Sequence, residues 1–396
     1  MKSQLSRAHG AEGSNAGAWE ESDITRMRNG IVELVIRNSG GHLAEFRFLE
    51  RDGESSPSVL WESPWRFEKL HEAIPEDLAQ TAGFTGHGLC LDNFGAPTAE
   101  QAAKGMVQHG EAARYYWTRS QWERDSDAVS QWNVHLPVAR LDFERKIQLG
   151  ENESVAYIDE AVVNLRGADH VCDWVEHATF GPSFVTNEDT VFAASGARGL
   201  TAPDGYGDDS LVDHGTEFQW PFAPLLPPLD GVADLRIPFA AQGKGIVATV
   251  QMDPRRDVQY IVAVNRRYQL GVGYCFRRQD FPWMMIWEEN NVRQDRPWHG
   301  SAQARGMEFG STPFPWGRDE SMRHGRVFET PSWCTIPANG RKSARYLMFL
   351  FRTPNGPAAV SDVSLRQNAI EVVGADGQTL ATIAARNSEE FLKGAL

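Results

Sequence analysis

Three side chains occupy positions where acid–base chemistry is often carried out, next to glycine or proline residues that shape the backbone. Glu308 lies in WHGSAQARGMEFGSTPFPWG, residues 298–317, and the Gly, Pro and Trp content of this stretch predicts a loop. Trp298 and Trp316 could line such a loop as apolar surfaces around a polar ligand. A carboxylate beside apolar rings is costly to ionise, so we expect the pKa of Glu308 to rise toward the range of a general base.

Two histidines occur in similar surroundings. His177 lies in CDWVEHATFGPSF, where an apolar strand leads into Gly181 and Pro182, and His109 precedes Gly110 in VQHGEAARYYW. A single strand histidine is more often structural than functional. Two histidines and a carboxylate together supply an acid and a base near neutral pH, which indicates proton transfer to and from oxygen.

The elements that must position these residues are predicted to be β-strands. Leu141–Leu149 alternates apolar and polar residues, and 31–37 and 42–49 form a hairpin across an Asn-Ser-Gly-Gly turn. Further strands are expected at 155–165, 245–252, 260–264, 270–276, 284–288 and 344–352. Many short strands without long amphipathic helices predict an all-β sandwich of large antiparallel sheets.

Other segments are predicted to connect or flank these strands. We expect a loop at 83–95, helical turns at 76–80 and 99–104, and a long surface excursion at 194–241 that could cover a cleft. The tail from Val360 should hold two short strands and a helical turn at 388–393, with Ser388 as its N-cap. Residues 1–23 are expected to form a disordered leader, and 24–396 a single domain without internal repeats.

Charge and composition restrict the ligand. The formal net charge of −14 argues against nucleic acid or an anionic membrane as the partner, because both attract basic surfaces. A small or neutral ligand fits better, and the 13 Trp and 20 Phe residues include flat rings that suit sugars. The chain has no apolar run of the ~18–20 residues that span a membrane, and no signal-peptide core at its start. We therefore expect a cytoplasmic protein.

The four cysteines, at positions 90, 172, 275 and 334, are widely spaced and form no CxxC pair. Neither a zinc site nor a disulfide framework is indicated, so reduced thiols are expected. His87, His109 and His177 show no H-x-H or H-E-x-x-H spacing, so no metal is predicted.

In its order of motifs the sequence resembles the aldose 1-epimerases, or galactose mutarotase-like proteins. The resemblance covers about residues 31–352. It rests on GGHLAEFRF, on HGxxxRxxW from His109 to Trp117, on EHATFGPSF around His177, on the late Glu308, and on IPANGRKSARYLMF from Ile336. It implies a β-supersandwich with a shallow cleft and the cofactor-free interconversion of sugar anomers.

The resemblance also implies roles for the three candidate residues. Glu308 matches the family's base, which takes the proton of the anomeric hydroxyl, and His177 matches the acid that protonates the ring oxygen. His109 matches the family's other histidine, which holds and polarises the same region. The ring would open to the aldehyde, rotate about C1–C2 and close as the other anomer.

Six further residues are predicted to bind the substrate, and some of them depart from the family pattern. Arg114 comes one residue later than the family's arginine, the local match around Asp280 is weak, and the GMEFG context of Glu308 is uncommon. These differences suggest a subfamily with another substrate. The six predicted substrate-binding residues are His87, Arg114, Trp117, Asp280, Trp298 and Trp316.

Arginines at 277, 278, 293 and 318 leave the charge of the substrate open. A guanidinium in the cleft could bind a carboxylate, phosphate or sulfonate on a modified sugar. The alternative is that these arginines are surface residues that balance acids such as Glu288 and Glu289.

Two rival functions share the predicted fold. A carbohydrate lyase would need a base at a sugar C5, for which Tyr115, Tyr116 and His87 are candidates. A sugar-binding module would keep the cleft without the chemistry. The sequence determines neither the sugar nor the oligomeric state.

Overall fold

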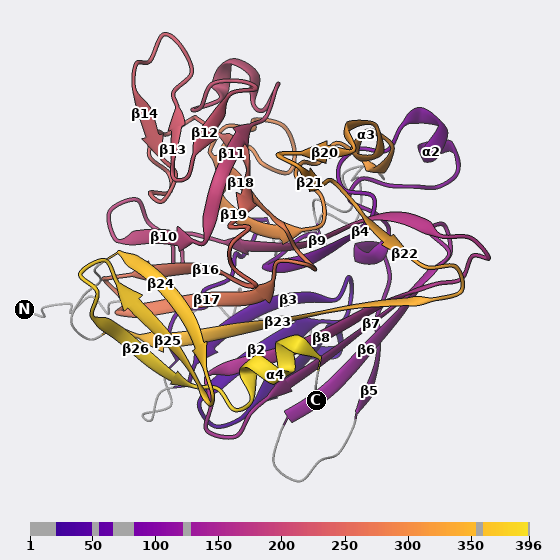
Figure 1. The fold of residues 1–396 in the computed structure, drawn as a ribbon, viewed down its shortest axis with the longest axis horizontal. Coiled ribbons are helices and arrows are strands. Elements are labelled where there is room, and N and C mark those ends of the chain that lie inside the picture. Colours follow the sequence, from indigo (N-terminus) through magenta and orange to yellow (C-terminus); the bar gives the residue numbers. More distant parts are fainter. Residues whose placement is uncertain (1–20, 50–54, 66–82, 122–127, 354–358, 395–396) are drawn as a thin grey trace, which may run out of the picture.

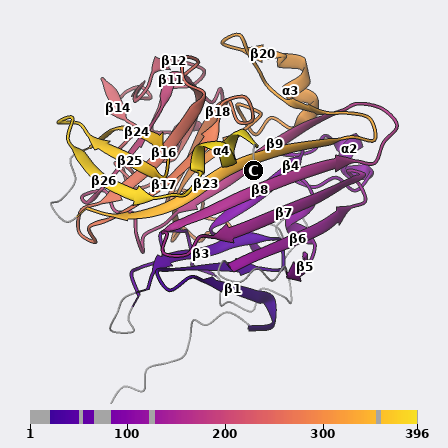
Figure 2. The ribbon, with the colours of Figure 1, turned by 60° about the horizontal axis from the view of Figure 1, so that its bottom comes forward.

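Two large antiparallel sheets lie face to face and form the body of the protein (Figures 1 and 2). The computed structural model describes residues 21–49, 55–65, 83–121, 128–353 and 359–394. The helical turn expected at 76–80 lies outside these residues, as do residues 1–20 of the expected leader. Glu21–Asp23 form a short 3-10 helix, η1, directly before the first strand. The boundary between leader and domain stays a prediction.

The larger sheet has 13 strands in the described residues and carries the candidate chemistry. Its hydrogen-bonded order is β1 (Ile24–Arg28), β2 (Val32–Arg37), β3 (His42–Phe48), β4 (His87–Asp92), β9 (His170–Phe180), β19 (Gln303–Gly310), β18 (Trp283–Asn290), β15 (Ile246–Met252), β11 (Gly196–Thr201), β12 (Glu217–Gln219), β13 (Phe222–Pro224) and β14 (Val232–Asp234), and β22 (Cys334–Ile336) also pairs with β9. Strands from both halves of the chain therefore meet at its centre.

The second sheet has eight described strands. Their order is β10 (Thr190–Ala194), β16 (Val258–Asn265), β17 (Leu270–Arg277), β23 (Arg341–Arg352), β8 (Val155–Asn164), β7 (Leu141–Leu149), β6 (Ala128–Leu136) and β5 (Thr118–Gln121). Its outer face is partly covered by a three-stranded sheet and α4 from the C-terminal region (Figure 1). The remaining elements are β24 (Val360–Arg366), β25 (Ala369–Gly374), β26 (Thr379–Ala384), β20 (Arg326–Val327), β21 (Thr330–Pro331), α2 (Ala99–Ala103), η3 (Ala112–Arg114), η4 (Gly207–Asp209), α3 (Arg318–His324) and α4 (Ser388–Lys393).

Side-chain alternation explains why the two sheets pack together. On β7, Leu141, Phe143, Ile147 and Leu149 are buried between the sheets, as predicted, whereas Lys146 is exposed. The main core lies between the sheets, and a second apolar cluster lies beneath the three-stranded sheet. Burial of this kind stabilises by roughly 25 cal/mol per Å² of apolar surface. The predicted all-β class, the 31–49 hairpin and the helical turn at Ala99 are confirmed.

Four local predictions are wrong. The expected loop at 83–95 contains β4, and Glu308 lies within β19 rather than in a loop. Both segments are glycine-rich, but central pairing in a sheet overrides that local signal. The tail forms three strands instead of two, and although its helix spans Ser388–Lys393 as predicted, the N-cap position is Asn387 rather than Ser388. The excursion at 194–241 is not one long loop, because it contains four strands that extend the larger sheet, but it does border a cavity, described below, through Asp204 and Gly205. In the described part of the chain, no helix is long and apolar enough to cross a membrane.

Candidate functional site

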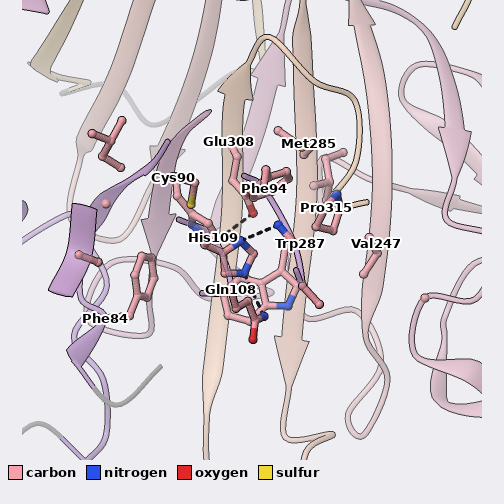
Figure 3. Close-up of a pocket in the computed structure, with 18 of the residues that line it drawn as sticks. Phe84, Cys90, Phe94, Gln108, His109, Val247, Met285, Trp287, Glu308 and Pro315 are labelled. Atoms are coloured by element: carbon pink, nitrogen blue, oxygen red, sulfur yellow. Dashed lines mark hydrogen bonds and ion pairs between the residues drawn. The ribbon is translucent and has the colours of Figure 1, made fainter. Parts of the chain in front are cut away.

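A cavity of about 570 Å³ opens on the face of the larger sheet that points away from the main core. Glu308, His177, His109 and Trp298 line it together. Figure 3 shows Glu308, Met285 and Trp287 reaching it from neighbouring strands, with the His109 ring close to them. Four of the nine residues singled out in the sequence therefore meet around one space large enough for a sugar ring.

Strand register brings the two central groups together. The pairing of β9 with β19 sets Phe309 opposite Glu176 and Gly306 opposite Thr179, which places Glu308 opposite His177. The Nε2 atom of His177 lies 3.2 Å from Oε1 of Glu308. Gly306 leaves room for this contact, because a Cβ there would lie 2.8 Å from the same carboxyl oxygen.

Thr179 orients the His177 ring from the same face of β9. Its Oγ1 lies 2.9 Å from Nδ1 of His177 and 3.4 Å from the His177 carbonyl oxygen. Because the hydroxyl donates to the carbonyl, it accepts a hydrogen bond from the N–H group at Nδ1. Nδ1 then keeps its hydrogen whether the ring is neutral or charged. The mobile proton is confined to the contact between Nε2 and Glu308.

Burial sets the protonation of this pair. Desolvation raises the pKa of Glu308 well above its ordinary 4.5. Desolvation, aided by the nearby His109, lowers the pKa of His177 well below 6.5. Both shifts favour an uncharged pair in which the Glu308 carboxyl keeps its proton and donates a hydrogen bond to Nε2 of His177. One proton moving across this contact converts it into a carboxylate and an imidazolium.

His109 approaches the same cavity from a turn rather than from a strand. Its backbone is left-handed, with φ of 61°, and Gly110 follows with φ of 79°. The Gly95 amide donates to Nδ1 of His109 over 3.2 Å, which leaves Nε2 to carry the hydrogen of the neutral ring. The rings of His109 and His177 are 6.3 Å apart. Burial lowers the pKa of His109 to about 4, so it is a neutral donor near pH 7.

Aromatic rings form the cavity walls. Phe84 packs edge-on against His177 with 4.7 Å between ring centres, and Trp287 does so at 5.7 Å. The indole N–H of Trp287 donates to the Tyr206 hydroxyl over 2.7 Å, which holds that ring in place. Trp298 packs against Trp287 at 5.9 Å. Flat apolar walls beside polar groups are the surfaces on which sugar rings bind.

Among the described residues, Arg293 is the one arginine that lines the cavity. Its guanidinium stacks over Trp298 at 4.7 Å, and its Nε lies 3.5 Å from the buried carboxylate of Glu289. Asp204 also lines the cavity. The other three arginines contact groups elsewhere. Arg277 contacts Asp257, Arg278 contacts the Met252 carbonyl and Thr330, and Arg318 contacts Asp92.

Five predicted substrate-binding residues do not line this cavity. Arg114 is exposed on η3, and Asp280 is half-buried in the turn after β17, where burial raises its pKa to about 6. Trp316 stacks on His324 with 3.9 Å between ring centres. Trp117 is buried in the main core, where its indole donates to the Ala112 carbonyl.

His87 belongs to a buried polar network between the two sheets. Its Nε2 lies 2.9 Å from Glu176, and the Tyr274 hydroxyl lies 3.3 Å from its Nδ1. Burial lowers its pKa to about 3, so the ring is neutral. Of the residues considered for a lyase, His87 is thus in the interior, and neither Tyr115 nor Tyr116 lines the cavity.

Sequence reasoning missed several lining residues. Trp287 and Met285 lie two apart on β18 and point to the same face, a spacing visible in WMMIWEEN. Thr179, which contacts His177 without lining the cavity, lies two residues after it on β9. Nothing in the sequence showed that these strands are neighbours. Within the described ranges, no three His, Cys, Asp or Glu side chains gather as metal ligands.

Comparison with known proteins identifies the fold. No family model matches the chain, and no curated protein matches its sequence. A galactose mutarotase-like protein from Clostridium acetobutylicum is similar in structure, with a TM-score of 0.54, 14 % identity, and coverage of 83 % of this chain and 94 % of that one. A galactose mutarotase related enzyme from Lactobacillus acidophilus gives a TM-score of 0.51 and 12 % identity, with 84 % and 99 % covered.

A third similar structure is an aldose epimerase homologue from C. elegans, with a TM-score of 0.50, 9 % identity, and coverage of 83 % and 98 %. At such identities the likeness shows a shared fold and does not show a shared activity. The fold is the galactose mutarotase-like β-sandwich expected from the sequence.

Proposed function

We propose that this protein interconverts the anomers of a sugar by acid–base ring opening, as an aldose 1-epimerase does. The observation that carries the proposal is the His177–Glu308 contact of 3.2 Å inside an aromatic-walled cavity. It supplies an acid and a base that share one mobile proton. Each positioned proton-transfer group contributes ~10²–10⁴-fold, which suits a reaction that already proceeds in water.

The reaction begins with Glu308 as carboxylate and His177 as imidazolium. Glu308 takes the proton of the anomeric hydroxyl while Nε2 of His177 gives a proton to the ring oxygen. The bond from C1 to the ring oxygen breaks, and C1 becomes an aldehyde carbon. Rotation about C1–C2 followed by the reverse transfers closes the ring as the other anomer.

This sequence fits the burial of the pair. Once the ring is open, Glu308 holds a proton and His177 is neutral, which is the distribution that desolvation favours. The charged form is needed only with the closed sugar, whose hydroxyl and ring oxygen solvate it. His109, as a neutral N–H donor, would hold the same region of the sugar.

We expect a neutral aldose rather than an anionic sugar. Arg293 is paired with Glu289, and Asp204 also lines the cavity, so these groups offer an anion no net positive charge. The guanidinium can still donate to sugar hydroxyls from its place over Trp298.

Anomer exchange by saturation-transfer NMR tests the proposal on a panel of neutral, acidic and phosphorylated aldoses. Wild type should accelerate exchange of a neutral sugar, and Glu308→Gln should reduce the rate at least ~10²-fold. Glu371→Gln, on the peripheral strand β25, is the control and should keep full activity. Binding without faster exchange for any sugar would favour a sugar-binding module, and an unsaturated product absorbing in the ultraviolet would favour a lyase.

A further inference from the structure

Two cysteines outside the cavity face each other across neighbouring strands. Cys172 on β9 and Cys334 on β22 are direct partners in the antiparallel register. Directly opposite residues place their side chains on one face with Cα atoms about 4.5–5.5 Å apart. A disulfide needs Cα atoms about 4.4–6.8 Å apart, so the backbone already has a separation that a disulfide can bridge. Both thiols are free in this structure.

The two thiols differ in access and in surroundings. Cys172 is fully buried, whereas Cys334 is partly exposed. The Cys334 thiol donates to the Cys172 carbonyl over 3.3 Å, and the Cys172 thiol donates to the Asp173 carbonyl over 3.3 Å. When Cys334 ionises, the Cys172 thiol can turn its hydrogen from the Asp173 carbonyl to the thiolate, which lowers the pKa of Cys334, while burial raises the pKa of Cys172. Cys334 is therefore the more readily ionised and more accessible nucleophile.

We propose that Cys172 and Cys334 form an oxidation site, which peroxides or small-molecule disulfides convert into a cross-strand disulfide. With hydrogen peroxide, the Cys334 thiolate attacks one oxygen and becomes a sulfenic acid, and hydroxide leaves and is protonated to water. The Cys172 thiol then attacks the Cys334 sulfur, its proton passes to the departing hydroxyl, and a second water leaves. The two thiols lose two electrons, and the peroxide gains them.

With a small-molecule disulfide, the Cys334 thiolate attacks one sulfur and expels one thiol. Cys172 then displaces the second thiol from the mixed disulfide. The product bond closes a loop between positions 162 residues apart. It joins β22, which follows α3, to the strand that carries His177. The site does not depend on the proposed sugar chemistry.

The test is oxidation of the full chain, reduced beforehand, with hydrogen peroxide or with oxidised glutathione. Titration of free thiols under denaturing conditions should fall from the four cysteines of the sequence to two. Peptide mapping without reductant should recover one linked pair that contains Cys172 and Cys334. The oxidised protein should also unfold at a higher temperature, and reductant should reverse both changes.

Matched variants decide the assignment. Cys334→Ser, at the partly exposed member, and Cys172→Ala should each abolish the linked peptide. Cys90→Ser and Cys275→Ser should leave it unchanged. A linked pair of any other composition would overturn the proposal. So would oxidation that stops at a glutathione adduct or a sulfinic acid in folded wild type. Cys334→Ser alone suffices if Cys172→Ala does not fold.

Discussion

Thr179 is the residue whose role follows most directly from its contacts. Its hydroxyl accepts from Nδ1 of His177 over 2.9 Å in a buried position. Thr179→Val would leave that N–H without a partner. The unpaired N–H costs ~1–3 kcal/mol, which favours the tautomer with its hydrogen on Nε2 instead of Nδ1. We expect kcat/KM for anomer exchange to fall about tenfold to a hundredfold, while Thr179→Ser keeps most of the rate. Full activity in Thr179→Val together with a loss in Thr179→Ser would show that the methyl group matters rather than the hydroxyl.

The shared proton of His177 and Glu308 also predicts the pH profile. The active pair carries one proton, so activity is lost when it gains a second or loses the first. On the acidic side, the second proton must bind the His177 imidazole, whose pKa is lowered below 6.5. On the basic side, the first proton leaves from the pair, in which the pKa of Glu308 is raised above 4.5. A plot of kcat/KM against pH should therefore stay level to below pH 6.5. An acidic limb at or above pH 6.5 would contradict the assignment of His177.

Across the elements, the site is one row of the larger sheet. Gly88 on β4, His177 on β9, Glu308 on β19 and Met285 on β18 are successive cross-strand partners. A bulge or register slip in any of these strands would separate the acid from the base, since slipping by one residue moves side chains to the other face.

Gly306 tests this dependence on the strand surface. A Cβ at that position would lie 2.8 Å from Oε1 of Glu308 and 3.3 Å from Cβ of Trp287. Gly306→Ala should displace the carboxyl group and reduce kcat/KM by about tenfold or more, with the circular dichroism spectrum unchanged. The matched control is Gly167→Ala, at a position with open space around it and no left-handed backbone. Full activity in Gly306→Ala would show that Glu308 tolerates a shift.

At the scale of the whole molecule, the two sheets are joined by buried charges as well as by apolar packing. Arg145 on β7 contacts Glu160 over 2.5 Å and Glu176 over 3.2 Å, and it donates to the Gly41 carbonyl over 2.7 Å. The Tyr346 hydroxyl lies 3.1 Å from Glu160 and 3.2 Å from Glu176, so its one hydrogen is shared between the two carboxyl groups. Glu176 precedes His177 on β9, so this network lies directly behind the cavity.

Removing Arg145 should therefore destabilise the fold. Arg145→Met would leave two buried carboxylates without their cation, at a cost of about 3–5 kcal/mol. The free energy of unfolding in urea measures this loss. Lys146→Met, at the exposed neighbouring position, should change it by less than ~1 kcal/mol. A small change in Arg145→Met would show that the buried carboxyl groups do not need the cation.

The sequence by itself determined the all-β class and most strand positions, because alternation on strands such as Leu141–Leu149 reports burial directly. It also brought out Glu308, His177, His109 and Trp298 as candidates through their local motifs. It misjudged the segments around His87 and Glu308 as loops, because glycine content is a local signal. Pairing on both sides within a sheet supplies the hydrogen bonds that override it.

Only the tertiary structure decided which candidates share a cavity. His87 and His177 lie on adjacent strands, yet one side chain enters the interior and the other enters the cavity, since neighbouring positions differ in face. The wall formed by Trp287, the orientation of His177 by Thr179 and the facing thiols of Cys172 and Cys334 all depend on strand order and register. These arise from contacts between residues far apart in the chain, and no local pattern of residue types encodes them.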